Sequence, residues 1–260
     1  MHEDAGVGRA ARTKLGSLLP GSLTWALACG LAFCAACLET RRSVLFQARD
    51  ASAADAGSCG EPSTPCAGDI RLEPGSETPI VGGDAGTAQA DLCPEPQVLI
   101  GYAGTLREIE ALPTDSEVIS SLVGLCGTLA LAESGELVVR AESPLPERGE
   151  QRGAYGPWTR ACPADTTLIG ADARAGLALD QLRLRCARWQ LEPGSDAPSV
   201  AEESELTPIG GEGGKAFVIA CPAGQVARGH DLRAGRWIDA FGFLCARPRI
   251  GPEALEREKN

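Results

Sequence analysis

Two stretches near the C-terminus decide the fold: CPADTTLIGADARAGLALDQLRLRCARWQL at 162–191 and CPAGQVARGHDLRAGRWIDAFGFLCARPRI at 221–250. They align without a gap. Counted from the opening cysteine, both have Gly at +8, Arg at +12, Gly at +14, Asp at +18 and Cys at +24. Such a set of matches at identical spacing indicates an internal duplication.

A third, more divergent copy precedes these two. It begins with CPEPQVLIGYAG at Cys93, again with Gly at +8, and ends with VISSLVGLC at Cys126, which is +33. This copy is therefore 9 residues longer (33 − 24). Ser120 stands where the other copies have Asp180 and Asp239.

The period of the repeat comes from the closing cysteines and the linkers. Cys66, Cys126, Cys186 and Cys245 are 60, 60 and 59 residues apart. The linker LEPGSETPIVGGDAG at 72–86 matches LEPGSDAP and ELTPIGGEGG within 191–214. TPIVGG also matches the activated N-terminus of trypsin-like proteases, but the repeat explains it as a Gly-rich turn.

The repeat unit predicts an all-β domain. A period of about 60 residues is too long for most solenoid units and suits one four-stranded sheet per copy. Short apolar runs such as KAFVIAC (215–221) are separated by Gly, Pro and Asp, as strands and turns require. Only PEALEREKN (252–260) suggests a helix. We expect residues 66–250 to form three sheets around a common axis; a β-trefoil, which also has three repeats, is the alternative.

The N-terminus is typical of an export signal. Three basic residues between positions 9 and 14 precede an uncharged stretch, 15–38, whose apolar core is WALACGLAFCAACL. That core is short for a membrane-spanning helix. CAAC at 34–37 resembles a bacterial lipobox with Cys in place of the usual Leu, which makes Cys37 a candidate lipidation site; an ordinary signal peptide or an uncleaved anchor is the alternative. We therefore divide the chain into a signal (1–38), a flexible spacer (39–65), the repeat domain (66–250) and a tail (251–260).

Export makes the cysteine count informative. Eight of the 11 cysteines lie outside the signal, and an even number in an oxidising compartment predicts four disulfides. The simplest pairing is within copies. The predicted pairs are Cys93 with Cys126, Cys162 with Cys186, Cys221 with Cys245, and Cys59 with Cys66 in a truncated first copy. These eight contain no Cys-x-x-Cys pair and no His cluster accompanies them, so we predict neither zinc nor any other cofactor.

Composition and motifs argue against several functions. The net charge of −11 and pI near 4.8 oppose a phosphate-binding surface, so nucleic acid is not a predicted partner. The chain has only two histidines, His2 and His230, and lacks a Gly-Asp-Ser-Gly-Gly loop. Without a carboxylate pair, a nucleophile elbow or a metal set, a hydrolase has no support and we predict no enzyme activity.

The motifs GGEGGKAF (210–217) and GRWIDAFGF (235–243) resemble those of the jacalin-related lectins. The three disulfide-bearing copies look more like vitelline membrane outer layer protein, which shares the β-prism architecture. The resemblance covers about residues 66–250 and implies a sugar site in the loop 235–239. In it, the Asp239 carboxylate accepts hydrogen bonds from sugar hydroxyls, and loop backbone N–H groups donate others. The further ligand-binding candidates that the resemblance implies are Gly235, Arg236, Trp237 as an apolar face, Gly211 beside the site, and Gly176 and Asp180 as a second site.

A structural reading of the same residues stays open. Asp at a strand entry commonly accepts hydrogen bonds from nearby backbone N–H groups, and its recurrence at +18 fits such a role. We expect Trp237 and Trp189 to be packing residues, Arg174 and Arg233 to brace turns, and His230 to lie on the surface. The predicted function is an exported, non-catalytic binding protein with glycans or envelope components as partners, attached to a membrane only if the N-terminal anchor is retained. The alternative is a structural or interaction protein of the envelope without a small-ligand site.

Overall fold

The computed structural model describes residues 70–109, 117–132 and 136–251. The predicted signal, Cys37, the Cys59 and Cys66 pair and the helix candidate at 252–260 lie outside these ranges. Within them every regular element is a β-strand, and no helix is long and apolar enough to cross a membrane. The strands are β1 (Ile70–Glu77), β2 (Val81–Gly82), β3 (Thr87–Leu92), β4 (Gln97–Glu108), β5 (Glu117–Leu131), β6 (Leu137–Pro144), β7 (Arg148–Gly149), β8 (Tyr155–Ala161), β9 (Thr166–Ala175), β10 (Leu179–Gln190), β11 (Ser199–Glu205), β12 (Ile209–Gly210), β13 (Lys215–Ala220), β14 (Val226–Ala234) and β15 (Ile238–Ile250).

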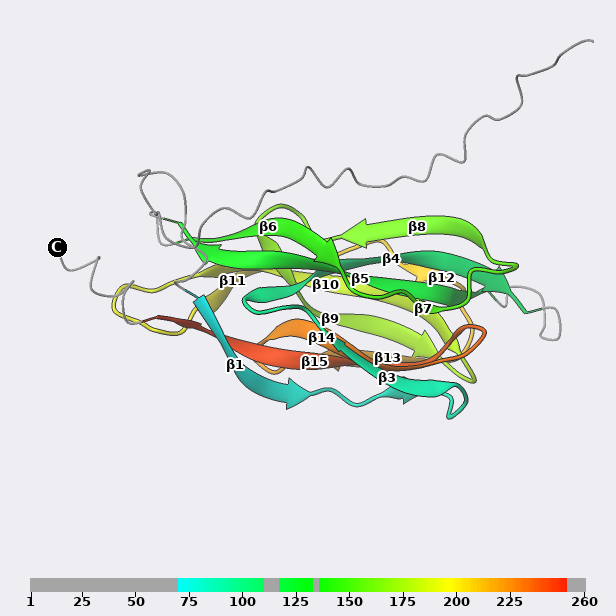
Figure 1. Cartoon of the computed structure of the whole chain (residues 1–260). Coiled ribbons are helices and arrows are strands. Elements are labelled where there is room, and N and C mark those ends of the chain that lie inside the picture. The colour runs from blue at the N-terminus through cyan, green and yellow to red at the C-terminus, as the bar shows by residue number, and fades with distance from the viewer. Residues whose placement is uncertain (1–69, 110–116, 133–135, 252–260) are drawn as a thin grey trace, which may run out of the picture. The chain divides into compact units, whose positions relative to one another are not determined.

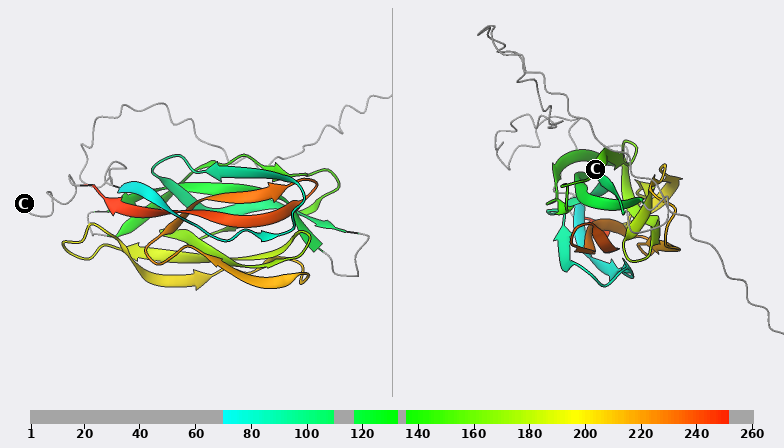
Figure 2. Two further views of the ribbon diagram at one scale, coloured as in Figure 1. Left: turned by 90° about the horizontal axis from the view of Figure 1, so that it is seen from below. Right: turned by 90° about the vertical axis from the view of Figure 1, so that its right-hand side faces the viewer.

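The strands form three antiparallel sheets of the same design. Sheet A has the order β1-β15-β14-β3, sheet B β6-β5-β4-β8 and sheet C β11-β10-β9-β13; β2, β7 and β12 add a short pairing to each. At the centre of each sheet is the hairpin of one sequence repeat. Figure 1 shows the three sheets from the side, and the right-hand view of Figure 2 shows them end-on, arranged around a shared core. This is the predicted β-prism with pseudo-threefold symmetry, and not the β-trefoil alternative.

The chain closes in a circle. The outer strands of sheets B and C come from the linker that follows each hairpin, β6 to β8 and β11 to β13. The last hairpin, β14–β15, receives its outer strands from β1 to β3 at the start of the domain. Ile70 pairs with Ile250 in an antiparallel register, so the first and last strands of the domain lie side by side. The Gly-rich segments of the second and third linkers thus pair with the hairpin that precedes them, and that of the first linker pairs with the last hairpin, β14–β15.

The glycine at +8 allows an edge strand of each sheet (β8, β13 or β3) to lie close to the neighbouring hairpin strand. A Cβ atom on Gly101 would lie 2.3 Å from the Arg160 carbonyl oxygen of β8. On Gly170 it would lie 2.7 Å from Cα of Ala220, and on Gly229 only 2.1 Å from the carbonyl oxygen of a β3 residue. Because these contacts are with backbone, a side chain could not be accommodated by a change of rotamer. The recurring glycine therefore serves the same packing need in all three copies.

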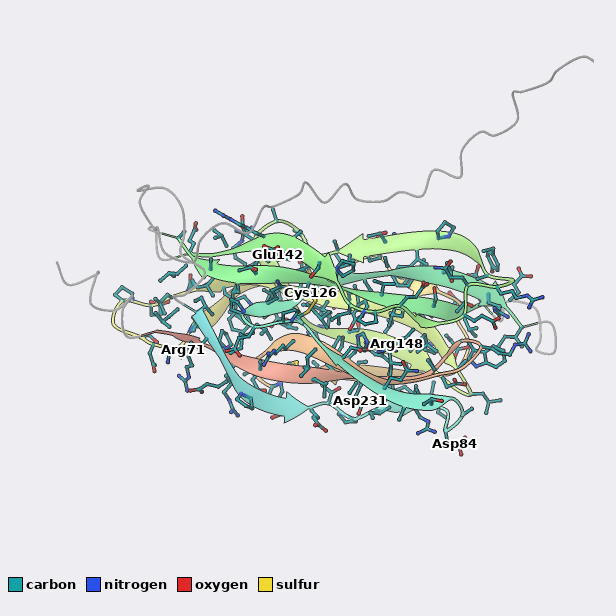
Figure 3. The ribbon with its side chains drawn as sticks, viewed as in Figure 1. Arg71, Asp84, Cys126, Glu142, Arg148 and Asp231 are labelled. Carbon is teal, nitrogen blue, oxygen red and sulfur yellow. A yellow bond between two sulfur atoms is a disulfide. The ribbon has the colours of Figure 1, made fainter. Side chains whose placement is uncertain are left out.

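Three of the predicted disulfides are present, and each joins two sheets. The pairs are Cys93 with Cys126, Cys162 with Cys186 and Cys221 with Cys245. In each pair the first cysteine directly follows an edge strand of one sheet (β3, β8 or β13), and the second lies within the hairpin of the next sheet. Figure 3 labels Cys126. The bridges therefore connect A to B, B to C and C to A. The predicted pairing is confirmed for these six cysteines.

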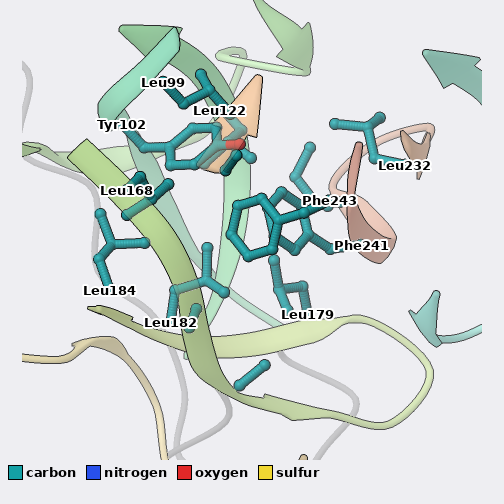
Figure 4. Packing of buried hydrophobic residues seen from close by; sticks show 14 of the residues in the cluster. Leu99, Tyr102, Leu122, Leu168, Leu179, Leu182, Leu184, Leu232, Phe241 and Phe243 are labelled. Carbon is teal, nitrogen blue, oxygen red and sulfur yellow. The ribbon is translucent and has the colours of Figure 1, made fainter. Parts of the chain in front are cut away.

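The core lies along the axis between the sheets. Residues at +9 point inward in all copies and are Tyr102, Ala171 and His230, each fully buried. The expectation that His230 lies on the surface is wrong, because it follows Gly229 at an inward position of β14. The ring of Tyr102 packs edge-on against that of Phe241, with 5.7 Å between the ring centroids, and the centroids of Phe241 and Phe243 are 5.0 Å apart (Figure 4).

A second apolar cluster contains Trp189 and confirms its expected packing role. Trp189 is 1% exposed, and its indole N–H donates to the Thr167 hydroxyl over 2.8 Å. Strands of all three sheets contribute to this cluster, including Ile70 and Ile250 from the two ends of the domain.

Candidate ligand-binding loops

The candidate residues lie on two equivalent hairpin loops at the same end of the domain. Residues 176–178 join β9 to β10, and residues 235–237 join β14 to β15 (Figure 1). The Gly176 N–H donates to the Ala178 carbonyl over 2.9 Å, and the Gly235 N–H donates to the Trp237 carbonyl over 3.0 Å. Each loop is thus a tight turn, and the candidate aspartate is the second residue of the strand that follows.

A Gly-rich loop lies beside each hairpin loop. The Gly83 N–H donates to the backbone carbonyl of Asp239 over 2.8 Å, and the Gly211 N–H donates to that of Asp180 over 2.9 Å. Gly211 was expected beside Asp239, and this placement is wrong. Each Gly-rich loop pairs with the hairpin that precedes it around the domain axis. Gly211 therefore lies beside Asp180. Gly83 is the counterpart beside Asp239.

Bare backbone surrounds each carboxylate. A Cβ atom on Gly86 would lie 2.4 Å from Oδ2 of Asp239, and one on Gly214 would lie 2.5 Å from Oδ2 of Asp180. The φ angles of these glycines are +67° and +62°, in the left-handed region that favours glycine. The Gly-rich loops of the two copies therefore bring backbone against the carboxylates in the same way.

Two arginines hold the Gly-rich loops in place. Arg233 donates from Nε to the Ala85 carbonyl over 2.8 Å and from Nη2 to the Gly86 carbonyl over 3.0 Å. Arg174 makes the equivalent bonds to the carbonyls of Gly213 and Gly214, over 2.8 and 3.1 Å. Both arginines are therefore turn-bracing residues, as expected.

Each carboxylate has one oxygen that is buried and unpartnered. Asp239 is 3% exposed and Asp180 is 7% exposed. Their Oδ2 atoms accept no hydrogen bond from the described part of the chain. Burial raises the pKa of Asp239; the Trp237 indole, Arg233 and the Gly235 N–H act in the opposite direction. Burial likewise raises the pKa of Asp180, opposed by Arg174. An unpaired buried carboxylate oxygen is unfavourable, so each loop presents an acceptor that a donor would stabilise.

The two loops differ in their neighbouring side chains. In the Asp239 loop, Arg236 is exposed, and its guanidinium lies 5.9 Å from the ring centroid of the half-buried Trp237. In the Asp180 loop the corresponding tip residue is Leu177, which is 78% exposed. The loops also touch, because a Cβ on Gly83 would lie 2.4 Å from the Leu177 carbonyl oxygen. Sequence reasoning missed Leu177 and Gly83, although both stand in the segments that it compared.

The first copy satisfies its polar groups internally. Ser120, at the position of the aspartate, is fully buried and donates to the Glu150 carbonyl over 2.7 Å. Its hydroxyl also accepts a hydrogen bond from Nε of Arg107 over 3.1 Å, and Arg107 further donates to the Arg152 carbonyl. This copy therefore presents no carboxylate at the equivalent place.

Other chemistry is not supported by the described residues. Within 70–109, 117–132 and 136–251, no cluster of three or more His, Cys, Asp or Glu side chains could hold a metal ion. A groove on sheet C is lined by residues of β9, β10 and β13, among them Arg174 and Gln181 near the Asp180 loop. Across it, Arg183 and Asp172 pair with each other at 2.9 Å, so its charges are satisfied.

No protein-family model matches the chain, and no curated protein sequence matches it. Among solved structures it is similar to Calystegia sepium agglutinin, at 14% identity and a TM-score of 0.44, over 68% of this chain and 98% of that one. It is similar to the Malaysian banana lectin at 15% identity and a TM-score of 0.42, over 67% and 99%. A mannose-binding jacalin-related lectin from Ananas comosus matches at 18% identity and a TM-score of 0.42, over 68% and 98%. The expected resemblance to β-prism lectins is therefore found among solved structures, and it is a likeness of fold.

Proposed function

We propose that the domain is a non-catalytic carbohydrate-binding module whose principal site is the Asp239 loop. One observation carries the proposal. The Asp239 Oδ2 atom is buried without a hydrogen-bond partner in the described residues, at the exposed end of the domain and beside a glycine-lined loop. A carboxylate is an acceptor-only group when ionised, and neighbouring sugar hydroxyls can supply the donors that it lacks.

The surrounding residues suit a sugar ring. Gly235 and Arg236 are exposed, so the loop backbone is accessible to a ligand. Trp237 is half-buried and offers apolar surface, on which the C–H groups of a pyranose can pack. Its indole N–H acts on the Asp239 carboxylate and lowers the pKa of that group, so the ring lies beside the acceptor.

Asp180 provides a second, weaker candidate site. It has the same unpartnered Oδ2 atom and the same bracing arginine, Arg174. Its loop has no aromatic residue, and Leu177 is the apolar side chain at the tip. Since Leu177 also touches Gly83 of the first site through its carbonyl, a longer glycan bound at Asp239 would extend toward Leu177.

We further propose that the protein is exported, as a surface lipoprotein or a secreted protein. Three disulfides between sheets require an oxidising compartment to form and persist. The basic and apolar N-terminal segment and the candidate lipidation site Cys37 agree with this, and envelope glycans are then the ligands within reach.

The alternative is a structural or interaction protein without a small-ligand site. It is favoured by the equal bracing of both Gly-rich loops, because Arg174 and Arg233 would be needed for the fold alone. In that case Asp180 and Asp239 would serve only their own turns, and neither would have a ligand to lose.

A glycan array followed by calorimetry on the purified chain tests the proposal. Mannose-type glycans are suitable first probes, because the Ananas comosus lectin is mannose-binding and Calsepa lectin was solved with a biantennary N-glycan. We expect Asp239→Ala to abolish binding with little change in the melting temperature, because one oxygen of the carboxylate that it removes has no hydrogen-bond partner among the described residues and burial opposes the charge. Asp180→Ala is the matched control and should leave most binding intact. If the parent chain binds no glycan and both variants lose about 1 kcal/mol of stability, the structural alternative is correct.

A further inference from the structure

A chain of four polar side chains connects sheet A to sheet B. Arg148 of β7 donates to both carboxylate oxygens of Asp91 in β3, over 2.7 and 2.6 Å. Nε2 of His230 in β14 lies 3.3 Å from Oδ2 of Asp91, and its Nδ1 lies 3.3 Å from the hydroxyl of Tyr102 in β4. His230 is fully buried, and Asp91 is 10% exposed at its side chain. Figure 3 labels Arg148 of this chain.

We call the contact between two neighbouring sheets a seam. In the described residues, the seams B–C and C–A lack such a series of hydrogen-bonded polar side chains. Asp91, Arg160 and Ile219 occupy equivalent positions on β3, β8 and β13, opposite the three residues at +9. Arg160 donates to the backbone carbonyl of Thr207 over 3.3 Å. Ile219 is a buried apolar residue. The A–B seam alone thus joins its sheets through a histidine.

The partners of His230 fix where its proton lies. Ionised Asp91 can only accept, so the proton is on Nε2, and Nδ1 then accepts from the Tyr102 O–H. A second proton on Nδ1 would face the Tyr102 hydroxyl, which would have to turn its own hydrogen into a fully buried site. The remaining neighbours offer no acceptor, because the equivalent residue on β9 is Ala171 and β15 presents the ring of Phe241.

Charge around the ring also opposes protonation. Asp91 attracts a cation on His230, but this carboxylate is already paired with the Arg148 guanidinium. Burial lowers the pKa of His230 from its usual 6.5 to about 4; Asp91 acts in the raising direction and Arg148 in the lowering direction. The neutral ring is therefore the form that the closed seam accepts.

We propose that these four residues form an acid-sensitive latch, in which protonation of His230 opens the seam between sheets A and B at β3 and β7. The seams B–C and C–A have neither a histidine nor a carboxylate at the equivalent places, which are occupied by Tyr102 with Arg160 and by Ala171 with Ile219, so we expect these seams to stay closed. The Cys93 to Cys126 disulfide begins directly after β3 and tethers the two sheets. Opening is therefore local and reversible.

The size of the effect follows from linkage. The pKa of His230 is about 4 in the closed state and takes its ordinary value of 6.5 once the ring reaches water. The closed state is therefore favoured fully above pH 6.5 and loses that preference as the pH falls toward 4. Between pH 7 and pH 5 the equilibrium constant for opening rises by about 20-fold on these values.

Amide hydrogen exchange of the full chain, corrected for intrinsic rates, tests the latch. We expect the protection of amides in β3 and β7 to fall about 20-fold from pH 7 to pH 5, while β13 changes little. His230→Gln should remove this pH response, because its amide can donate to Asp91 and accept from Tyr102 but does not titrate. NMR titration of His230 gives the direct readout, and we expect it to titrate well below the ordinary histidine value of 6.5.

Three results would overturn the proposal. Titration of His230 at its ordinary value of 6.5 would contradict the neutral, buried ring on which the proposal rests. Equal acid loss of protection in β3 and β13 would mean general loosening and no latch. A pH response that persists in His230→Gln would place the titrating group elsewhere. If that variant does not fold, the comparison of β3 with β13 in the parent chain still decides.

Discussion

Alanine in place of the +8 glycines should force the edge strands β8, β13 and β3 away from the hairpins that they pair with. The variants Gly101→Ala, Gly170→Ala and Gly229→Ala place the same methyl group at three equivalent positions. The nearest atoms are backbone in every case, at 2.3 Å, 2.7 Å and 2.1 Å from the new Cβ. Real Cβ atoms essentially never come within 3.0 Å of another heavy atom, so a strand must move in each variant.

The expected magnitude is the difference between two effects. Overpacking against backbone costs about 1–3 kcal/mol, and the loss of glycine's freedom in the unfolded chain returns about 0.4–1 kcal/mol. Gly229→Ala should therefore destabilise most, by about 2 kcal/mol or more. Gly101→Ala should follow, and Gly170→Ala should be mildest at about 1 kcal/mol, because its closest contact is the longest of the three.

Urea unfolding with the disulfides intact gives the free energies of unfolding. Gly176→Ala is the matched control, since its Cβ would meet nothing closer than 3.6 Å, and we expect it to change stability by less than about 0.5 kcal/mol. If the three +8 variants were as stable as this control, the close-approach account of the repeat would be refuted. If Gly170→Ala lost the most stability, the ranking by contact distance would be refuted, although the steric crowding at all three sites would still stand.

Two further predictions concern the joints between the sheets. Arg148→Met should cost about 2–3 kcal/mol in urea unfolding, because it removes the charged partner of the mostly buried Asp91 carboxylate. Arg183→Met breaks a more exposed ion pair with Asp172 and should cost less than about 1 kcal/mol; equal losses would contradict the role of burial. Replacing Cys162 and Cys186 together by Ser should cost about 3 kcal/mol, given their separation of 24 residues, and an unchanged unfolding midpoint would show that sheets B and C hold together without the bridge.

The fold could be predicted from sequence because the repeated positions carry distinct physical tasks. Glycine at +8 admits a neighbouring strand, arginine at +12 grips the carbonyls of a Gly-rich loop, and cysteine at +24 joins the next sheet. The glycine recurs at the same spacing in all three copies, and the arginine and the closing cysteine do so in two, so the spacing indicates the repeat. The disulfide pairing followed from the same spacing.

The circular closure could not be read from the sequence. A linker between two hairpins can pair with the one before it or the one after it, and its composition is the same in both cases. The pairing of β6 with β5 and of β11 with β10 shows that a linker joins the preceding hairpin, and the pairing of β1 with β15 shows that the first linker joins the last hairpin. Gly211 was placed beside the wrong aspartate for this reason, while the kind of contact that it makes was expected correctly.

His230 was misplaced because its partners are distant in sequence. It stands among Arg228, Gly229 and Asp231, in a strand whose alternation of polar and apolar residues is weak. Its hydrogen-bond partners Tyr102 and Asp91 lie 128 and 139 residues away, in other strands. A buried polar residue becomes recognisable only when the groups that satisfy it are known.

The three copies bear on whether Asp180 and Asp239 serve structure or binding. Arg174 and Arg233 hold the Gly-rich loops in place by donating hydrogen bonds to backbone carbonyls. The first copy keeps a buried arginine, Arg107, at the corresponding loop and replaces the aspartate by Ser120, whose hydroxyl is fully paired. A scaffold that closes this end with a serine does not need a buried carboxylate there. In two copies a buried carboxylate nevertheless keeps an oxygen without a hydrogen-bond partner among the described residues, which is unfavourable. The proposed binding role would supply that oxygen with a donor from the ligand.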